Sequence, residues 1–229
     1  MRPFNICKVL LDGEDAAQLA PESRLDWQAH KKIAAHKIIK AVGEQLDRVG
    51  VICAGWAFRL AQLPNGRRQV LSILVPGDVI TPTRPFDDTV SYSVQALTDV
   101  RYCGYSRSLL NERLREDERL LIAWTELITA ERKQNLEMLI DLGSLSAEER
   151  VADFLVQLVA RLARRPSLAQ EALVVPLPQW LIAATLGLST EHVSRIVSTL
   201  RQRNVVESGR GFLRIVDLRE LRHVVGTRT

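Results

Sequence analysis

Residues 178–200, PQWLIAATLGLSTEHVSRIVSTL, decide the fold of this chain. Gly187 divides the stretch into two short helices, since glycine takes the positive φ that ends a helix, and Ser189 can cap the second one. At about 100° per residue, that second helix has one apolar side and one polar side. The pattern predicts a helix-turn-helix, with a helical hairpin buried in a core as the alternative. The polar side consists of Thr190, Glu191, Ser194, Arg195, Ser198 and Arg201.

The residues that follow favour the first interpretation. Residues 205–207 and 212–216 are apolar-rich and flank Ser-Gly-Arg-Gly at 208–211, which predicts a hairpin with a glycine-rich tip. A helix-turn-helix followed by a hairpin is a winged helix. Arg210 at the tip would then lie near a phosphate backbone.

The charge distribution agrees with nucleic-acid binding. The 229-residue chain has a net charge of +4, and residues 144–229 contain twelve arginines, no lysine and eight acidic residues, so the rest is neutral. The planar arginine fork suits phosphates and guanine edges.

Composition sets the broad class. With 46% hydrophobic and 25% charged residues the chain reads as a globular protein of one large or two small domains. No apolar run reaches the ~18 residues of a spanning helix, and no signal peptide is evident, so we expect a cytoplasmic protein without a membrane partner. Three dispersed cysteines, Cys7, Cys53 and Cys103, fit a reducing compartment.

Four regions follow one another along the chain. Residues 1–26 form an irregular lead-in, and residues 27–107 carry short β-type runs that predict a sandwich, jelly roll or small barrel. These runs are 37–39, 49–53, 56–60, 69–74 and 92–97, with a hairpin signal at Asn65-Gly66. Residues 108–143 read as one long helix, and residues 144–229 hold the winged helix, opened by a capping box at Ser146–Glu149.

The long helix carries a heptad seam that suggests a two-stranded coiled coil. Packing of one helix face on the β region is the alternative, and Leu120, Leu127 and Leu139 offer a second stripe for it. Gly143 would place a hinge at the end of the helix. The seam consists of Leu121, Trp124, Ile128, Glu131, Asn135, Met138 and Leu142.

This order of parts resembles the Crp/Fnr family of bacterial transcription regulators. The resemblance rests on residues 66–71 (GRRQVL), 74–78 (LVPGD), 96–98 (ALT) and above all 187–195 (GLSTEHVSR). It implies an α+β fold: an N-terminal β-roll, which is jelly-roll-like and of the cyclic-nucleotide-binding-domain type, a long dimerisation helix and a C-terminal winged helix-turn-helix. It also implies a homodimer that binds double-stranded DNA and RNA polymerase.

Glu191, Ser194 and Arg195 match the Glu-x-x-Ser-Arg pattern of the Fnr-type recognition helix, which implies a TTGA-type half-site. Arginine can fork onto guanine, glutamate can accept from the cytosine amino group, and serine can touch a thymine methyl. The remaining candidate DNA contacts are Ser189, Thr190, Ser198, Arg201 and Arg210.

The chain departs from the family pattern in the residues that would bind the effector. Cyclic-AMP-binding members have Gly-Glu-x-x-Leu after the Gly-Asp turn and an Arg-Ser or Arg-Ala pair later, whereas this chain has TPTRPF at 81–86 and Val-Ser at 90–91. The ribose-binding carboxylate and the phosphate-binding arginine are both missing. The tentative effector pocket is Thr81, Thr83, Arg84, Val90 and Ser91.

The cysteines and histidines of the chain bear on other sensor chemistries. An iron–sulfur cluster needs four thiolates, and Cys7 alone lies near the N-terminus. His30 or His36 could be an axial haem ligand, and Cys53 or Cys103 could be a redox switch. The effector therefore stays unknown, with a haem- or redox-responsive regulator as one alternative and a ligand-binding module without DNA activity as another. No catalytic motif is present, so we do not expect an enzyme.

Overall fold

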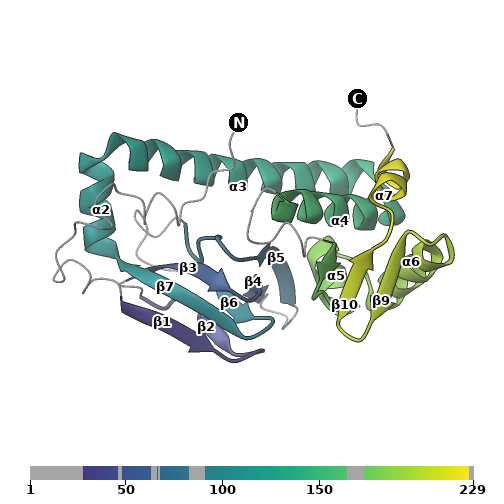
Figure 1. Cartoon of the computed structure of the whole chain (residues 1–229), viewed down its shortest axis with the longest axis horizontal. Coiled ribbons are helices and arrows are strands. Elements are labelled where there is room, and N and C mark those ends of the chain that lie inside the picture. The colour runs from purple at the N-terminus through teal and green to yellow at the C-terminus, as the bar shows by residue number, and fades with distance from the viewer. Residues whose placement is uncertain are drawn as a thin grey trace. The chain divides into compact units, whose positions relative to one another are not determined.

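The computed structural model describes residues 28–45, 48–62, 66, 68–82, 91–163 and 173–226. They fall into two compact units, one up to Gln134 and one from Asn135 (Figure 1). The lead-in, with Cys7, lies outside the described residues, as do Asn65 of the expected hairpin and three of the tentative effector residues, Thr83, Arg84 and Val90.

The first unit holds two antiparallel sheets with strand orders β1-β7-β3 and β2-β6-β4-β5. The five β runs expected from sequence correspond to β2 to β6. Two further strands, β1 and β7, were not singled out, although β7 is the centre of its sheet. The strands are β1 Gln28–Ile33, β2 Ile38–Lys40, β3 Arg48–Ala54, β4 Ala57–Gln62, β5 Arg68–Leu74, β6 Ser93–Ala96 and β7 Val100–Ser106.

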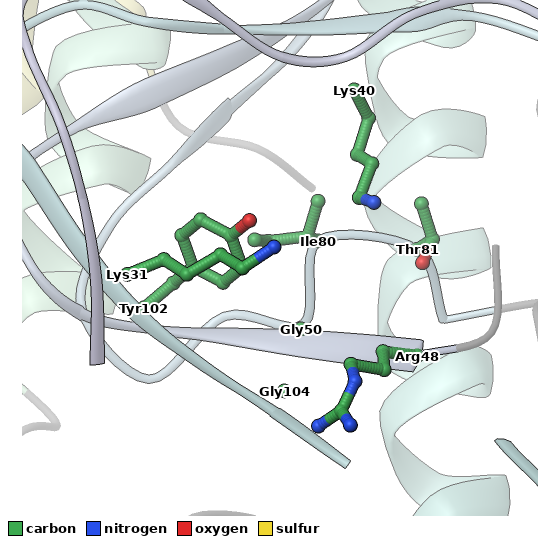
Figure 2. Close-up of a pocket in the computed structure, with 8 residues that line it drawn as sticks. All are labelled: Lys31, Lys40, Arg48, Gly50, Ile80, Thr81, Tyr102 and Gly104. Atoms are coloured by element: carbon green, nitrogen blue, oxygen red, sulfur yellow. The ribbon is translucent and has the colours of Figure 1, made fainter. Parts of the chain in front are cut away.

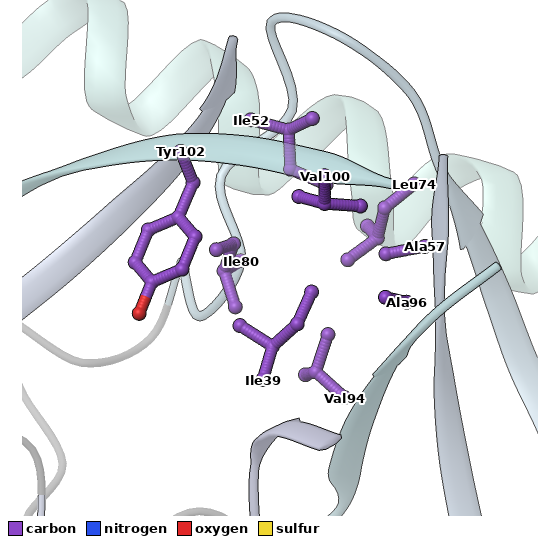
Figure 3. Packing of buried hydrophobic residues seen from close by; sticks show 9 residues of the cluster. All are labelled: Ile39, Ile52, Ala57, Leu74, Ile80, Val94, Ala96, Val100 and Tyr102. Atoms are coloured by element: carbon purple, nitrogen blue, oxygen red, sulfur yellow. The ribbon is translucent and has the colours of Figure 1, made fainter. Parts of the chain in front are cut away.

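The two sheets enclose an apolar core, as Figure 3 shows. Ile39 and Val94 of one sheet approach Ile52 and Tyr102 of the other. Alternate residues of a strand point to opposite faces, so β6 contributes Val94 and Ala96 to this core, and β7 contributes Val100 and Tyr102. The full cluster is Ile39, Ile52, Ala57, Leu74, Ile80, Val94, Ala96, Val100 and Tyr102.

The opposite face of β3 is covered by helices. Val49 and Val51 pack with Leu110, Leu114, Leu120 and Trp124 of α2 (Arg107–Glu116) and α3 (Glu118–Ser144). The single helix expected over 108–143 is therefore two helices. Asp117 causes the break, because it leaves the helical conformation (φ −112°, ψ 99°) and its carboxylate accepts the Leu120 N–H at 3.1 Å, as an N-cap does.

Three residues of the heptad seam, Trp124, Ile128 and Glu131, face the β-roll, whereas Leu121 is 43% exposed. Trp124 is 1% exposed, and its indole Nε1–H donates to the carbonyl of Pro82 at 3.2 Å. Glu131 interrupts the seam because its carboxylate accepts from the guanidinium of Arg59 on β4. Packing on the roll, which the sequence left as an alternative, thus applies to this part of α3.

The second unit combines helices α4, α5, α6 and α7 with a three-stranded sheet of order β8-β10-β9. Its first helix opens with the expected capping box, since Ser146 N–H donates to Glu149 at 2.7 Å and Glu149 N–H to Ser146 Oγ at 3.3 Å. No helix among the described residues is long and apolar enough to cross a bilayer. The elements are α4 Ala147–Ala163, β8 Val174–Val175, α5 Gln179–Leu186, α6 Thr190–Gln202, β9 Val206–Gly209, β10 Phe212–Ile215 and α7 Leu218–Val225.

Candidate nucleic-acid interface

The turn between α5 and α6 has the geometry expected from sequence. Gly187 adopts φ 65° and ψ 31°, and its N–H donates to the carbonyl of Ala183, which is a left-handed helix cap. Ser189 is the N-cap of α6, with its hydroxyl accepting the His192 N–H at 3.1 Å. Both caps are set by the local sequence, so they fix where α6 begins.

Burial then fixes which side of α6 faces outward. Val193, Val197 and Leu200 are at most 1% exposed and Ile196 is 7% exposed, and α5 packs against this side. The polar side is left open to solvent. An amphipathic helix held in this way presents one constant set of side chains.

Every side chain expected to contact DNA is exposed. Seven lie on α6 or at its cap, and Arg210 lies in the turn between β9 and β10. Thr199 is also exposed on this surface, and its hydroxyl donates to the carbonyl of Arg195 at 3.2 Å. Thr199 was not among the contacts expected from sequence, although its position four residues after Arg195 places it on the same helix face.

Glu191 is held in its charged form at the start of α6. The backbone N–H of its own residue, the Ser189 hydroxyl and the charge of Arg195 together lower the pKa of the Glu191 carboxyl. An ionised carboxylate only accepts hydrogen bonds. Glu191 is therefore suited to a donor such as an amino group.

The wing, which is the hairpin of β9 and β10, contains two glycines, Gly209 and Gly211. Gly211 has φ 83°, which suits glycine in the tight turn. At Gly209, an added Cβ would overlap the ring of Phe212, so a larger residue there requires this exposed ring to move. The exposed Arg214–Glu207 ion pair (3.2 Å) spans the two strands and contributes at most about 1 kcal/mol.

The tentative effector residues do not form one described site. Thr81 is 1% exposed, whereas Ser91 is exposed. The candidate haem ligand His36 is exposed in the turn between β1 and β2 with φ 67°, and the side chain of His30 lies outside the described residues.

One buried arginine in the described part of the roll is already occupied by contacts within the protein. Arg59 is buried, but its guanidinium already binds Glu131, the Ser72 hydroxyl (3.3 Å) and the carbonyls of Val79 (2.8 Å) and Ile80 (3.2 Å). The Tyr92 ring centroid lies 5.4 Å from it. This arginine is thus engaged within the protein rather than available for a ligand phosphate.

Two cysteines of the roll lie side by side. Cys53 on β3 and Cys103 on β7 are thiols whose Sγ atoms are 2.8 Å apart. Cys103 is buried and Cys53 is partly exposed. The sequence could not indicate this pairing, because the residues are separated by 50 positions and meet only through the β3–β7 ladder.

Comparison with known proteins identifies both halves of the chain. The cyclic nucleotide-binding domain family matches residues 30–117, and the Crp-like helix-turn-helix domain family matches residues 149–224. A probable transcriptional activator of Rhizobium leguminosarum is 31% identical over 176 residues, covering 77% of this chain and 72% of that protein. The transcriptional activator protein FnrL of Cereibacter sphaeroides is 28% identical over 195 residues (84% and 77%).

Solved structures share the fold. FixK2 from Bradyrhizobium japonicum superposes with a TM-score of 0.77 at 22% identity, covering 88% of this chain and 98% of that one. A CooA mutant from Carboxydothermus hydrogenoformans superposes with a TM-score of 0.71 at 16% identity (97% and 96%). With its cyclic nucleotide-binding-like domain and DNA-binding helix-turn-helix, the chain belongs to the Crp/Fnr family, whose members are transcription regulators and not enzymes.

Proposed function

We propose that this protein is a homodimeric transcription regulator that reads a TTGA-like inverted repeat with α6. The observation that carries the proposal is the exposed face of α6, on which Glu191, Ser194 and Arg195 stand at the spacing of the Fnr-type pattern. A promoter-bound regulator of this kind works in the cytoplasm and acts on RNA polymerase, which we propose as its protein partner.

Each of the three side chains contacts a different base of the half-site. Arg195 donates two hydrogen bonds to the guanine, the ionised Glu191 accepts one from the amino group of the paired cytosine, and Ser194 contacts a thymine methyl. Ser189, Thr190, Ser198, Arg201 and Arg210 contact the phosphates on either side, which sets register but carries no sequence information.

Binding to duplexes tests this proposal. Fluorescence anisotropy should give a much lower Kd for a duplex with a TTGA…TCAA inverted repeat than for one with both half-sites scrambled, by about 1–3 kcal/mol per lost base contact. Both titrations need the same salt concentration, because phosphate contacts make affinity salt-dependent. Equal Kd values would contradict sequence-specific reading.

The proposed dimer contact is the exposed apolar side of α3. Leu121 and Leu139 are 18 residues apart, about five helical turns, and so are Ile122 and Ile140. Each pair therefore points in one direction. Large apolar side chains in a continuous exposed stripe mark an interaction site. The exposed set is Leu121, Ile122, Leu136, Leu139, Ile140 and Leu142, each at least 43% exposed.

Replacing Leu139 by lysine should shift the protein from dimer to monomer, because it places a charge in the apolar contact. Leu139 is 66% exposed, so the folded chain itself should tolerate lysine. Sedimentation velocity would measure the mass. Gln134→Lys is the matched control, because exposed Gln134 lies about 140° around the helix from Leu139; a dimer in both variants would argue against this surface.

The thiol pair favours redox control over haem as the second candidate for the signal. A disulfide bond is about 2.0 Å long, so the 2.8 Å between Cys53 Sγ and Cys103 Sγ requires little movement. With a hydroperoxide as oxidant, one thiolate attacks the peroxide to give a sulfenic acid and an alcohol. The second thiol then displaces water, which leaves a disulfide.

Mild peroxide treatment should therefore remove two thiols and lower the mass by about 2 Da. Thiol titration and intact-mass spectrometry would measure both changes. Cys53→Ser should instead gain oxygen, because the partner thiol needed for the disulfide is missing. If the wild-type protein also gains only oxygen and loses no mass, the pair is not a switch.

A further inference from the structure

The ring of Phe212 occupies the place that a side chain on Gly209 would take. The two residues are direct cross-strand partners in the β9–β10 hairpin. A Cβ on Gly209 would overlap the Cε1 and Cζ atoms of the ring, so the outer part of the ring covers the Gly209 backbone. Between the two residues lie only Arg210 and Gly211, which form the turn at the tip of the wing. The contact is therefore one residue away from Arg210.

Core packing accounts for a similar arrangement in the β-roll but not for this one. Gly50 on β3 lies opposite Gly104 on β7. The space of the missing Gly50 side chain is filled by Ile80 and the ring of Tyr102 (Figure 2), which are 1% and 7% exposed and belong to the core. Phe212, in contrast, is 39% exposed. Burial in a core therefore does not explain why its ring covers a glycine.

The backbone at the wing tip has little to hold it in one conformation. Gly209 lies in β9, an edge strand of its sheet, and glycine inside a strand weakens it. Among the described residues other than glycine, only His36 and Asn204 have a positive φ, so Arg210 has a negative φ and Gly211 a positive one of 83°. This order of signs is that of a type II turn, which matches the twist of the strands less well than the type I′ and II′ turns that two-residue hairpins favour. The tip therefore depends on side-chain contacts across the hairpin.

The contact between Phe212 and Gly209 supplies such a side-chain contact. An aromatic ring over an edge glycine pins the register of two strands, and cross-strand pairs of this kind stabilise a sheet. The exposed Arg214–Glu207 ion pair lies one pair further from the tip on the same two strands and contributes little. Because Gly209 and Phe212 form the cross-strand pair next to the turn, their contact constrains the backbone of Arg210 directly.

We propose that Phe212 is a positioning residue for DNA binding: its ring on Gly209 holds the wing tip rigid, so that Arg210 meets the phosphate backbone at a fixed position. This role rests on the proposed function, in which Arg210 contacts a phosphate. Phe212 itself needs no contact with DNA. A pre-organised side chain loses less conformational entropy when it binds. Without the ring, the tip would have to become ordered as DNA binds, which weakens the Arg210 contact.

NMR relaxation of the free full-length protein tests the positioning without DNA. Backbone order parameters are about 0.85 for rigid residues and below about 0.6 for flexible ones. The Arg210 amide should be rigid in the wild-type protein and in Phe212→Tyr, which keeps the ring. It should become flexible in Phe212→Ala, and also in Gly209→Ala, because the added methyl group displaces the ring. Val216→Ala is the matched control, since it removes an apolar side chain of similar exposure (42%) four residues from Phe212.

The dependence of DNA affinity on salt measures the consequence for binding. Each lost phosphate contact lowers the slope of log affinity against log salt concentration by about 0.9. Arg210→Ala and Phe212→Ala should each lower the slope by about this amount per wing. The double variant should lower it no further, because Phe212 acts through Arg210. All three variants should keep the preference for the TTGA…TCAA duplex.

An Arg210 amide that stays rigid in both Phe212→Ala and Gly209→Ala would overturn the positioning role. A slope that falls in Arg210→Ala but not in Phe212→Ala would also overturn it and would leave the proposed phosphate contact intact. An unchanged slope in Arg210→Ala would instead show that the wing contact of the proposed function is wrong, and the role of Phe212 in DNA binding would fall with it. Gly209→Ala keeps the test decisive if Phe212→Ala does not fold, because it removes no side chain.

Discussion

Replacing Arg195 by alanine should strongly reduce the preference for the TTGA…TCAA duplex over its scrambled form. A bidentate arginine–guanine contact discriminates by about 1–3 kcal/mol, and a dimer makes it in both half-sites, so the loss should reach about 2–6 kcal/mol. Arg195 is exposed, and the Thr199 hydroxyl donates to its backbone carbonyl, which the substitution keeps. The fold should therefore survive, and anisotropy titrations with both duplexes would measure the change.

Two variants separate base reading from general attraction to DNA. Arg210→Ala at the tip of the wing should weaken binding to both duplexes alike and reduce the salt dependence, as expected for a phosphate contact. Arg222→Ala removes the same charge from the exposed face of α7 and should leave the preference intact. If Arg195→Ala kept the full preference, another side chain of α6 would have to read the guanine.

Replacing Glu131 by alanine should lower the free energy of unfolding of the first unit by about 2–3 kcal/mol. Removing one partner of a buried ion pair typically costs about 3–5 kcal/mol, and the side chain of Glu131 is 25% exposed against 8% for Arg59, which reduces the cost. The loss arises because the Arg59 charge stays buried without its counter-ion. Urea unfolding followed by circular dichroism would measure it.

The double variant Arg59→Met/Glu131→Leu distinguishes an ion pair from simple packing. Replacing both charges by apolar side chains of similar size is often neutral or stabilising, so the double variant should be more stable than Glu131→Ala. Glu126→Ala, at an exposed carboxylate on the same helix, should change stability by less than about 0.5 kcal/mol. Equal losses in all three variants would show that the pair has no specific role.

The DNA-reading half of the protein could be predicted from sequence because its signals are local. Gly187, Ser189 and the apolar side of α6 lie within 14 residues of one another, and they set the turn, the cap and the outward face without help from distant parts of the chain. Thr199 was overlooked although the same periodicity includes it. The family motif at 187–195 then added the expected half-site.

The sensor half was predicted only in outline because its contacts are long-range. The alternating pattern gave five strands, but β7 contains Gly104 and a mixed polar sequence, and it forms because β1 and β3 pair with it on both sides. Asp117 broke the predicted long helix by capping α3. In the sequence, Glu131 interrupts a coiled-coil seam. In the structure, it binds Arg59, which lies 72 residues away in the chain.

By itself, the sequence determined the winged helix-turn-helix, the order of the parts and the face that α6 presents, since each follows from spacings within one or two helical turns. Only the tertiary structure brought Cys53 to Cys103 and set Gly50 opposite Gly104. Those groups come from strands far apart in the chain. Their distances depend on strand pairing and register, which no local pattern specifies.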